Sequence, residues 1–256
     1  NLVLVDEGHR GAGGEEWMDK RNRLCSEGFS FEYSATFGQA MKASGKKDML
    51  HLYAKCILFD YSYKYFYGDG YGKEYSILNL AEEQHEEQRQ LYLAACLLAF
   101  YQQLKVYDGK KRELVPFNVE EPLWVFVGSK VNAVRTERGE KVSDVIDILL
   151  FLKRFLNNRP ETKEFIHRLL NGASQLNDTR GHDLFAGRFD YLIASHMDAS
   201  DIYDDVVTRL FNGAVVGAQM HIDNLKGVQG EIGLRLGDGE YFGVINVGDD
   251  RELIKL

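Results

Sequence analysis

The stretch that decides the fold is Leu2-Val3-Leu4-Val5-Asp6-Glu7-Gly8-His9, at residues 2–9. Its four apolar residues predict a buried strand, and the two acids mark the end of that strand. A polar segment with apolar residues at helical spacing follows over Glu15–Glu27, and a second strand is predicted over Phe29–Tyr33. Strand, helix and strand at this spacing are typical of a parallel α/β sheet, in which ligands bind at the carboxyl edge of the strands.

The two acids at the end of the first strand are the strongest chemical signal in the chain. An apolar strand that ends in Asp-Glu is the acidic motif of nucleoside triphosphatases. Asp6 is predicted to hold Mg²⁺ through water, and Glu7 to polarise the water that attacks the γ-phosphate. His9 follows closely and can hydrogen-bond towards a neighbouring motif. Two solvated acids at a strand end are the plain structural alternative.

A second motif, Ser34-Ala35-Thr36, follows the second predicted strand. Its hydroxyl side chains can hydrogen-bond back to the Asp-Glu-x-His segment, and such a link would couple nucleotide state to movement between lobes. On its own, a Ser-Ala-Thr triplet is more typical of a turn or a helix cap. Here, however, the triplet follows an Asp-Glu-x-His strand and one helix. This order predicts that the two motifs form one site at the sheet edge.

These motifs resemble those of superfamily-two helicases. The sequence DEGH at residues 6–9 is similar to motif II of that family, and YSATF at residues 33–37 is similar to motif III. The longer strings DEGHRGAGGEEW and FEYSATFGQA resemble the motor subunit of type III restriction enzymes and related DEAD/DEAH-type proteins. The sequence FVGSK at residues 126–130 is similar to motif IV, and residues 59–71 resemble the stretch that closes the first lobe.

The resemblance implies an α/β fold with parts of two RecA-like lobes, each a parallel sheet flanked by helices, with ATP and Mg²⁺ between them. It implies translocation along DNA, with double-stranded DNA favoured over RNA, and a modification methyltransferase as a partner subunit. The site residues that it implies are Asp6, Glu7 and His9 for catalysis, Ser34, Ala35 and Thr36 for coupling, and Ser129 and Lys130 for nucleic-acid binding.

The family's phosphate-binding loop, G-x-x-x-x-G-K-[ST], does not occur in the sequence. The nearest stretch is Gly70-Tyr71-Gly72-Lys73-Glu74, in which Glu74 replaces the hydroxyl residue and Tyr67 stands where the first glycine should be. The arginine-bearing final motif is not visible either. Without the amides and the lysine of the loop, nothing holds the β- and γ-phosphates.

The chain opens without Met on a strand pattern, so we expect an internal fragment. The phosphate-binding loop is then expected before Asn1, and motifs V and VI after Leu256. Residues 1–256 alone are predicted not to hydrolyse ATP.

Three regions are predicted. Residues 1–80 form the C-terminal part of the first RecA-like lobe, residues 81–122 a helical connector, and residues 123–256 the N-terminal part of the second lobe with an insertion and a C-terminal antiparallel β-meander. The predicted helices are Lys47–Tyr67, Glu82–Tyr107, Ser143–Asn157, Pro160–Asn171 and Ser200–Phe211, with a charged turn at Asp108–Arg112 and a loop over Gly172–Arg188. Further strands are predicted at Tyr75–Leu80, Leu123–Val127, Gln219–Leu225, Gly230–Leu236 and Tyr241–Val247.

Composition excludes several other classes of protein. The apolar fraction of 45% and the charged fraction of 27% are ordinary for a globular protein, and no apolar run reaches the roughly 18 residues of a membrane span. Cys25, Cys56 and Cys96 have no CxxC spacing, which argues against a disulfide framework or a zinc site and favours a reducing cytoplasm. The net charge of −8 argues against a protein that coats polyanions, but it allows a local nucleic-acid groove.

Two other functions stay open from the sequence. A degenerate RecA-like scaffold, with a vestigial acidic motif, could serve as a nucleic-acid or protein interaction module. An unrelated α/β hydrolase could use Asp6 or Glu7 with His9, but the sequence offers no nucleophile elbow for it.

Overall fold

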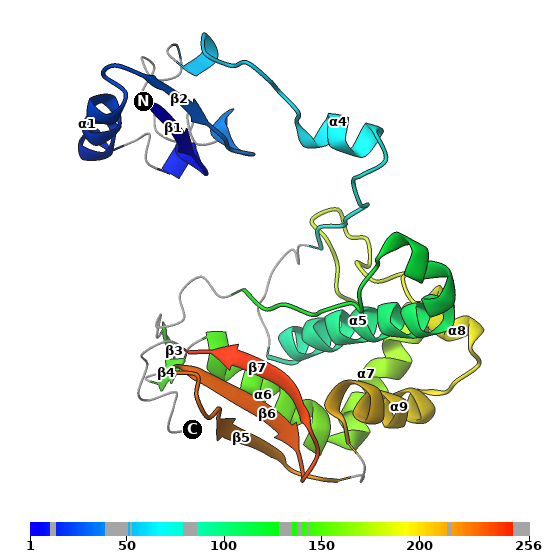
Figure 1. Cartoon of the computed structure of the whole chain (residues 1–256). Coiled ribbons are helices and arrows are strands. Elements are labelled where there is room, and N and C mark those ends of the chain that lie inside the picture. Colours follow the sequence, from blue (N-terminus) through cyan, green and yellow to red (C-terminus); the bar gives the residue numbers. More distant parts are fainter. Residues whose placement is uncertain are drawn as a thin grey trace. The chain divides into compact units, whose positions relative to one another are not determined.

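The structure, a computed structural model, describes residues 1–10, 14–38, 51, 53–78, 86–127, 135–137, 140–142, 144–213 and 217–247. The chain divides into an N-terminal unit, Asn1–Ser76, and a C-terminal unit, Ile77–Leu256 (Figure 1). The fold is mixed α/β, with a small parallel sheet in the first unit and an antiparallel three-stranded sheet near the C-terminus. The assignment to RecA-like lobes and the boundaries at residues 80 and 122 stay predictions.

The N-terminal unit begins with a strand–helix–strand arrangement. Strand β1 covers Leu2–Val5, helix α1 covers Glu15–Leu24 and strand β2 covers Phe29–Glu32. The two strands are parallel, with Leu2 opposite Phe29 and Val5 opposite Glu32. The predicted parallel pairing is therefore confirmed, and the carboxyl ends of both strands lie at the same edge. The predicted burial of the first strand is wrong, because Leu2 and Leu4 are both 65% exposed. A short 3₁₀ helix, η1 at Gly8–Arg10, follows β1 after the turn at Asp6 and Glu7.

The helix predicted over Lys47–Tyr67 is wrong in its extent. Residues 51, 53 and 54 are helical, residues 57–62 are irregular, and helix α4 covers only Tyr63–Gly68. Helix α4 has no buried residue. A helix with alternating tyrosines has no continuous apolar stripe to bury, because tyrosines two residues apart do not share a helix face.

The first helix described in the C-terminal unit is α5, Glu86–Leu114, which runs through the segment predicted as a charged turn. That prediction is wrong because tertiary contacts favour the helix there. The Asp108 carboxylate accepts a hydrogen bond from Arg209 Nε at 2.9 Å. At Gly109, an added Cβ would lie 3.2 Å from the Tyr191 hydroxyl, so this glycine allows a close approach rather than breaking the helix. The 3₁₀ helix η2, Val115–Phe117, then ends the segment.

Within the described residues of the C-terminal unit, four further helices follow. They are α6 at Asp144–Asn157, α7 at Arg159–Leu170, α8 at Asp190–Ala194 and α9 at Ala199–Phe211, which confirms the three longer helices predicted there. Figure 1 shows α7 beside α5 and α9, and these helices contact one another. Fully buried apolar side chains from all of them form one core, which includes Leu97, Phe151, Ile166, Leu192 and Ile202.

The C-terminal β-meander is also confirmed. Strands β5 (Met220–Asn224), β6 (Glu231–Leu236) and β7 (Tyr241–Asn246) pair antiparallel in that order. Apolar side chains of α6 pack against this sheet. Strands β3 (Arg135–Glu137) and β4 (Glu140–Val142) form a separate antiparallel pair.

The strands predicted at Leu123–Val127 and Tyr75–Leu80 are wrong. Residues 121–127 and 73–78 are not in a strand, and residues 79 and 80 lie outside the described part of the chain. Trp124 packs near Phe100, with ring centroids 5.9 Å apart, whereas Leu123 and Val127 are 82% and 89% exposed. No described strand pairs with this apolar segment, so its backbone has no neighbouring strand with which to form the hydrogen bonds of a sheet.

None of the described helices combines the length and the apolarity that crossing a membrane requires.

Candidate functional site

The two predicted motifs meet at the carboxyl edge of the parallel sheet. The pairing continues beyond the strands, because the Tyr33 amide donates to the Val5 carbonyl at 2.9 Å and the Gly8 amide donates to the Tyr33 carbonyl at 3.0 Å. These two backbone bonds fix the turn after β1 beside the segment that follows β2. Residues 6–9 and 33–36 therefore form one local structure.

The acidic turn has an unusual backbone at Glu7. This residue has a φ of +49°, in the left-handed region that L-amino acids other than Asn, Asp and Gly rarely enter. The Glu7 amide donates to Asp6 Oδ1 at 2.9 Å. Both acids are exposed, and the Glu7 carboxylate reaches His9, with Oε2 3.0 Å from Nδ1. The two adjacent acids therefore have different partners: Asp6 accepts from the Glu7 amide, and the Glu7 carboxylate contacts His9.

His9 connects the acidic turn to the Ser-Ala-Thr motif. Its Nδ1 lies 2.7 Å from Ser34 Oγ, and that hydroxyl oxygen also accepts a hydrogen bond from the Thr36 amide at 3.0 Å. Ala35 and Thr36 are themselves exposed. The structure therefore brings Glu7, His9 and Ser34 together, while their chemical roles stay predictions.

Both neighbours of His9 use the same ring nitrogen, and this limits the chemistry. Glu7 Oε2 and Ser34 Oγ both approach Nδ1. An ionised carboxylate only accepts hydrogen bonds, so the contact with Glu7 favours the state in which Nδ1 carries the proton. In a Ser-His-acid triad the acid and the serine bind opposite ring nitrogens. The arrangement therefore argues against the α/β-hydrolase alternative.

Gly8, between Glu7 and His9 in the sequence, is buried and closely packed. An added Cβ would lie 3.0 Å from Glu32 Cβ and 3.1 Å from Phe37 Cζ. The Phe37 ring in turn contacts His9 edge-on, with ring centroids 6.4 Å apart. Gly8 and Phe37 belong to the predicted motifs, but neither was given a role from the sequence, and Glu32 was not singled out. A glycine between the acids and the histidine is nevertheless a recognisable signal.

A partly buried ion pair lies next to this turn and was also missed. Arg21 donates to Glu32 Oε1, and the two side chains are only 16% and 9% exposed. The Tyr53 hydroxyl donates to Glu32 Oε2 at 3.0 Å. Burial, followed by the hydrogen bond to Glu32, raises the pKa of Tyr53 to about 12. The available signal was the glutamate within the apolar strand sequence FSFEY at residues 29–33.

The predicted magnesium site fits the residues only in part. No group of three or more His, Cys, Asp or Glu side chains in the described ranges is arranged to hold a metal ion. Mg²⁺ usually keeps several waters and takes one or two carboxylates together with substrate phosphates. The exposed Asp6 carboxylate can supply one such ligand through water. The remaining ligands would have to come from water and phosphate.

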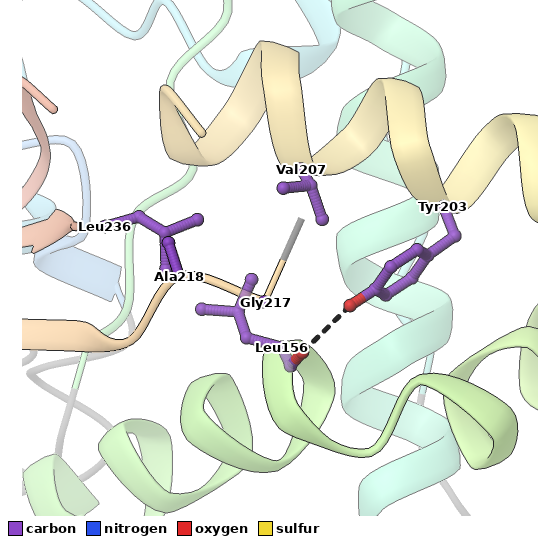
Figure 2. A pocket seen from close by; sticks show the side chains of 6 residues that line it. All are labelled: Leu156, Tyr203, Val207, Gly217, Ala218 and Leu236. Carbon is purple, nitrogen blue, oxygen red and sulfur yellow. Dashed lines mark hydrogen bonds between the residues drawn. The ribbon is translucent and has the colours of Figure 1, made fainter. Parts of the chain in front are cut away.

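Two further candidate sites are a predicted nucleic-acid site and a small pocket. Ser129 and Lys130, predicted to bind nucleic acid, lie outside the described residues. The C-terminal unit has a small pocket, lined by Leu156, Tyr203, Val207, Gly217, Ala218 and Leu236 (Figure 2). The Tyr203 hydroxyl in this lining already has a hydrogen-bond partner, because it donates to the Leu156 carbonyl at 2.9 Å. This lining has no charged side chain that could bind a phosphate.

In comparisons with protein-family models, curated proteins and solved structures, the chain matches none. Any function assigned to the edge site therefore depends on the geometry of its residues and on the resemblance of its motifs.

Proposed function

We propose that this chain is part of an ATP-driven nucleic-acid motor of the superfamily-two helicase type, similar to the motor of type III restriction enzymes. The observation that carries the proposal is the contact between His9 Nδ1 and Ser34 Oγ at 2.7 Å. It joins the acidic turn after β1 to the Ser-Ala-Thr segment after β2, and the parallel pairing of these strands puts both at the edge where α/β sheets bind ligands.

Glu7 is the residue that would orient the attacking water. Its Oε2 is occupied by His9, and the side chain is 48% exposed, which leaves the second carboxylate oxygen accessible to water. A carboxylate in this position can polarise water for attack on a phosphoryl group. When bound, Mg²⁺ would neutralise developing phosphate charge, and Asp6 would hold it through water.

The His9–Ser34 contact would couple the chemistry to movement. Ser34 belongs to the segment after β2, so a displacement of that segment would pull on His9 and, through Nδ1, on Glu7. A conformational change has such an effect only if the contact differs between states. The proposal therefore assigns Ser34 a coupling role rather than a chemical one.

The rest of the motor would come from polypeptide outside residues 1–256. In this proposal that polypeptide supplies the phosphate-binding loop, the arginine motif and the remainder of two RecA-like lobes. Double-stranded DNA would be the track, a methyltransferase subunit a partner, and the cytoplasm the location. With a net charge of −8, the chain would grip DNA in a local groove rather than by its overall charge.

The test is the DNA-stimulated ATP turnover of the full-length product of the reading frame. Glu7→Gln keeps the shape of the side chain but removes its basicity, so kcat should fall about 10²–10⁴-fold. The matched control is Glu16→Gln, which removes an exposed carboxylate that pairs with Lys20 on α1. Equal turnover in Glu7→Gln and wild type would refute the proposal.

A degenerate scaffold is the second candidate, favoured by one observation. Leu2, Leu4 and Phe29 of the parallel strands are exposed, and exposed apolar patches often mark interaction surfaces. In this case Glu7→Gln would leave the function of the full-length product intact, while replacing these apolar residues with polar ones would abolish it.

A further inference from the structure

The Arg21–Glu32–Tyr53 group lies directly against the acidic turn. We call these three residues the Glu32 cluster. Glu32 has both carboxylate oxygens engaged, Oε1 by Arg21 and Oε2 by Tyr53 at 3.0 Å. Arg21 also donates to the Tyr53 hydroxyl at 3.3 Å. Each member therefore contacts the other two, and the Glu32 carboxylate has one fixed orientation.

The cluster comes from three separate segments of the N-terminal unit. Arg21 belongs to α1, Glu32 ends β2, and Tyr53 follows much later in the chain. A buried ion pair is weak evidence for stability, because burying two charges is unfavourable and apolar replacements are often as stable. Its best-attested use is to specify one arrangement of the groups around it.

The cluster reaches the acidic turn at two points. Gly8 lies against the Glu32 side chain, because an added Cβ would be 3.0 Å from both Cβ and Oε2 of Glu32. The Phe37 ring contacts both His9 and Tyr53, at centroid distances of 6.4 and 5.1 Å. The backbone between Glu7 and His9 and the imidazole itself are therefore both supported by the cluster.

We propose that Arg21, Glu32 and Tyr53 are positioning residues that hold Glu7 and His9 in their working arrangement. This inference rests on the proposed ATP hydrolysis, but the three residues do not themselves touch reacting atoms. Glu32 would keep Gly8 pressed towards β2. The Tyr53 hydroxyl, by its hydrogen bond to Glu32, would hold the Tyr53 ring in the place where it keeps Phe37 against the imidazole. With both supports in place, His9 Nδ1 stays within reach of Glu7 and Ser34.

A spectroscopic test on the 256-residue chain separates positioning from mere stability. The ¹⁵N resonances of the His9 imidazole report whether Nδ1 keeps its hydrogen bond in the folded protein. In Glu32→Gln and Tyr53→Phe we expect them to move to the values of a solvent-exposed imidazole, for which a histidine in a short unstructured peptide is the reference. Arg21→Lys keeps the charge and should retain the wild-type resonances.

The matched control is again Glu16→Gln, which removes a carboxylate from the surface of α1 and should leave His9 unchanged. If Glu32→Gln fails to fold, Tyr53→Phe decides, since it removes only a hydroxyl group. Wild-type His9 resonances in folded Tyr53→Phe would overturn the proposal. A change at His9 in the Glu16→Gln control would also overturn it, because the effect would not be specific to the cluster.

Turnover of the full-length product gives the second readout. A displaced general base should lower kcat by about 10–100-fold in Tyr53→Phe while KM for ATP changes less than about twofold. Unchanged kcat in Tyr53→Phe would overturn the positioning role. If Glu7→Gln also has no effect, the proposed function itself fails. The failure of the proposed function and the failure of the positioning role can be told apart, because the His9 resonances are measured without any ATP turnover.

Discussion

Gly8 is the residue whose replacement best tests the packing of the edge site. In Gly8→Ala, the new Cβ would lie 3.0 Å from Glu32 and 3.1 Å from Phe37, closer than ordinary contacts. We expect a loss of about 1–3 kcal/mol in the free energy of unfolding of the N-terminal unit, as for other overpacked sites. The protein has two tryptophans, so urea unfolding can be followed by Trp17 fluorescence in a Trp124→Phe background.

Gly38→Ala is the matched control for this substitution. A Cβ at Gly38 would meet nothing within 4 Å. Its free energy of unfolding should therefore stay close to that of wild type. If both variants unfold alike, the close packing at Gly8 is not as described.

The raised pKa of Tyr53 predicts how the stability of the N-terminal unit changes at high pH. Its pKa is raised from 10.0 to about 12, by burial first and then by Glu32. In the unfolded chain Tyr53 ionises near pH 10, so its contribution to stability is complete below that pH and is lost as the pH rises to about 12. The difference in phenolate absorbance between wild type and Tyr53→Phe should report one tyrosine ionising near pH 12. In Glu32→Gln this ionisation should move to lower pH; no movement would exclude the hydrogen bond.

At the scale of elements, helix α9 begins with a capping box. The Asp198 carboxylate accepts hydrogen bonds from the amides of Ser200 and Asp201 at 2.8 Å, and the Asp201 carboxylate accepts one from the Asp198 amide. Asp198→Ala should lower the stability of the C-terminal unit by about 1 kcal/mol. Urea unfolding followed by Trp124 fluorescence in a Trp17→Phe background measures the change.

Asp198→Asn is the companion variant, because asparagine caps helices as well as aspartate does. It should restore most of the lost stability. If Asp198→Asn is as destabilised as Asp198→Ala, charge rather than capping accounts for the effect.

Several elements that the sequence predicted well have an apolar pattern that matches their burial, but strand β1 does not, because Leu2 and Leu4 are both 65% exposed. Helix α6 presents Phe151 and Phe155 at i and i+4 to the core, and this helical spacing is visible in the sequence. The three strands of the meander are separated by turns with glycines such as Gly227 and Gly237, whose φ angles are positive. The parallel order of β1 and β2 followed from the helix between them.

The elements that the sequence predicted wrongly depend on contacts distant in the chain. Nothing near Asp108 shows that Arg209, about a hundred residues later, will bind it and favour a continuous α5. The apolar segment at Leu123–Val127 has the composition of a strand, but a strand also requires a hydrogen-bonding neighbour. The candidate site likewise has a part that could be predicted from the sequence and a part that could not. The motif residues were visible locally, whereas the Arg21–Glu32–Tyr53 contacts depend on the tertiary structure.

At the scale of the whole molecule, residues 1–256 contain Glu7, the carboxylate proposed to orient water, but the sequence has no phosphate-binding loop motif. General-base catalysis typically contributes about 10²–10⁴ in rate, whereas enzymes accelerate reactions by at least about 10⁶. A missing arginine finger alone removes about 10³–10⁵ in this class of reaction. The chain alone should therefore release no phosphate from Mg²⁺–ATP above a Glu7→Gln control, with or without double-stranded DNA. Release that depends on Glu7 would mean that residues within 1–256 hold the phosphates after all, and the division of the active site proposed above would be wrong.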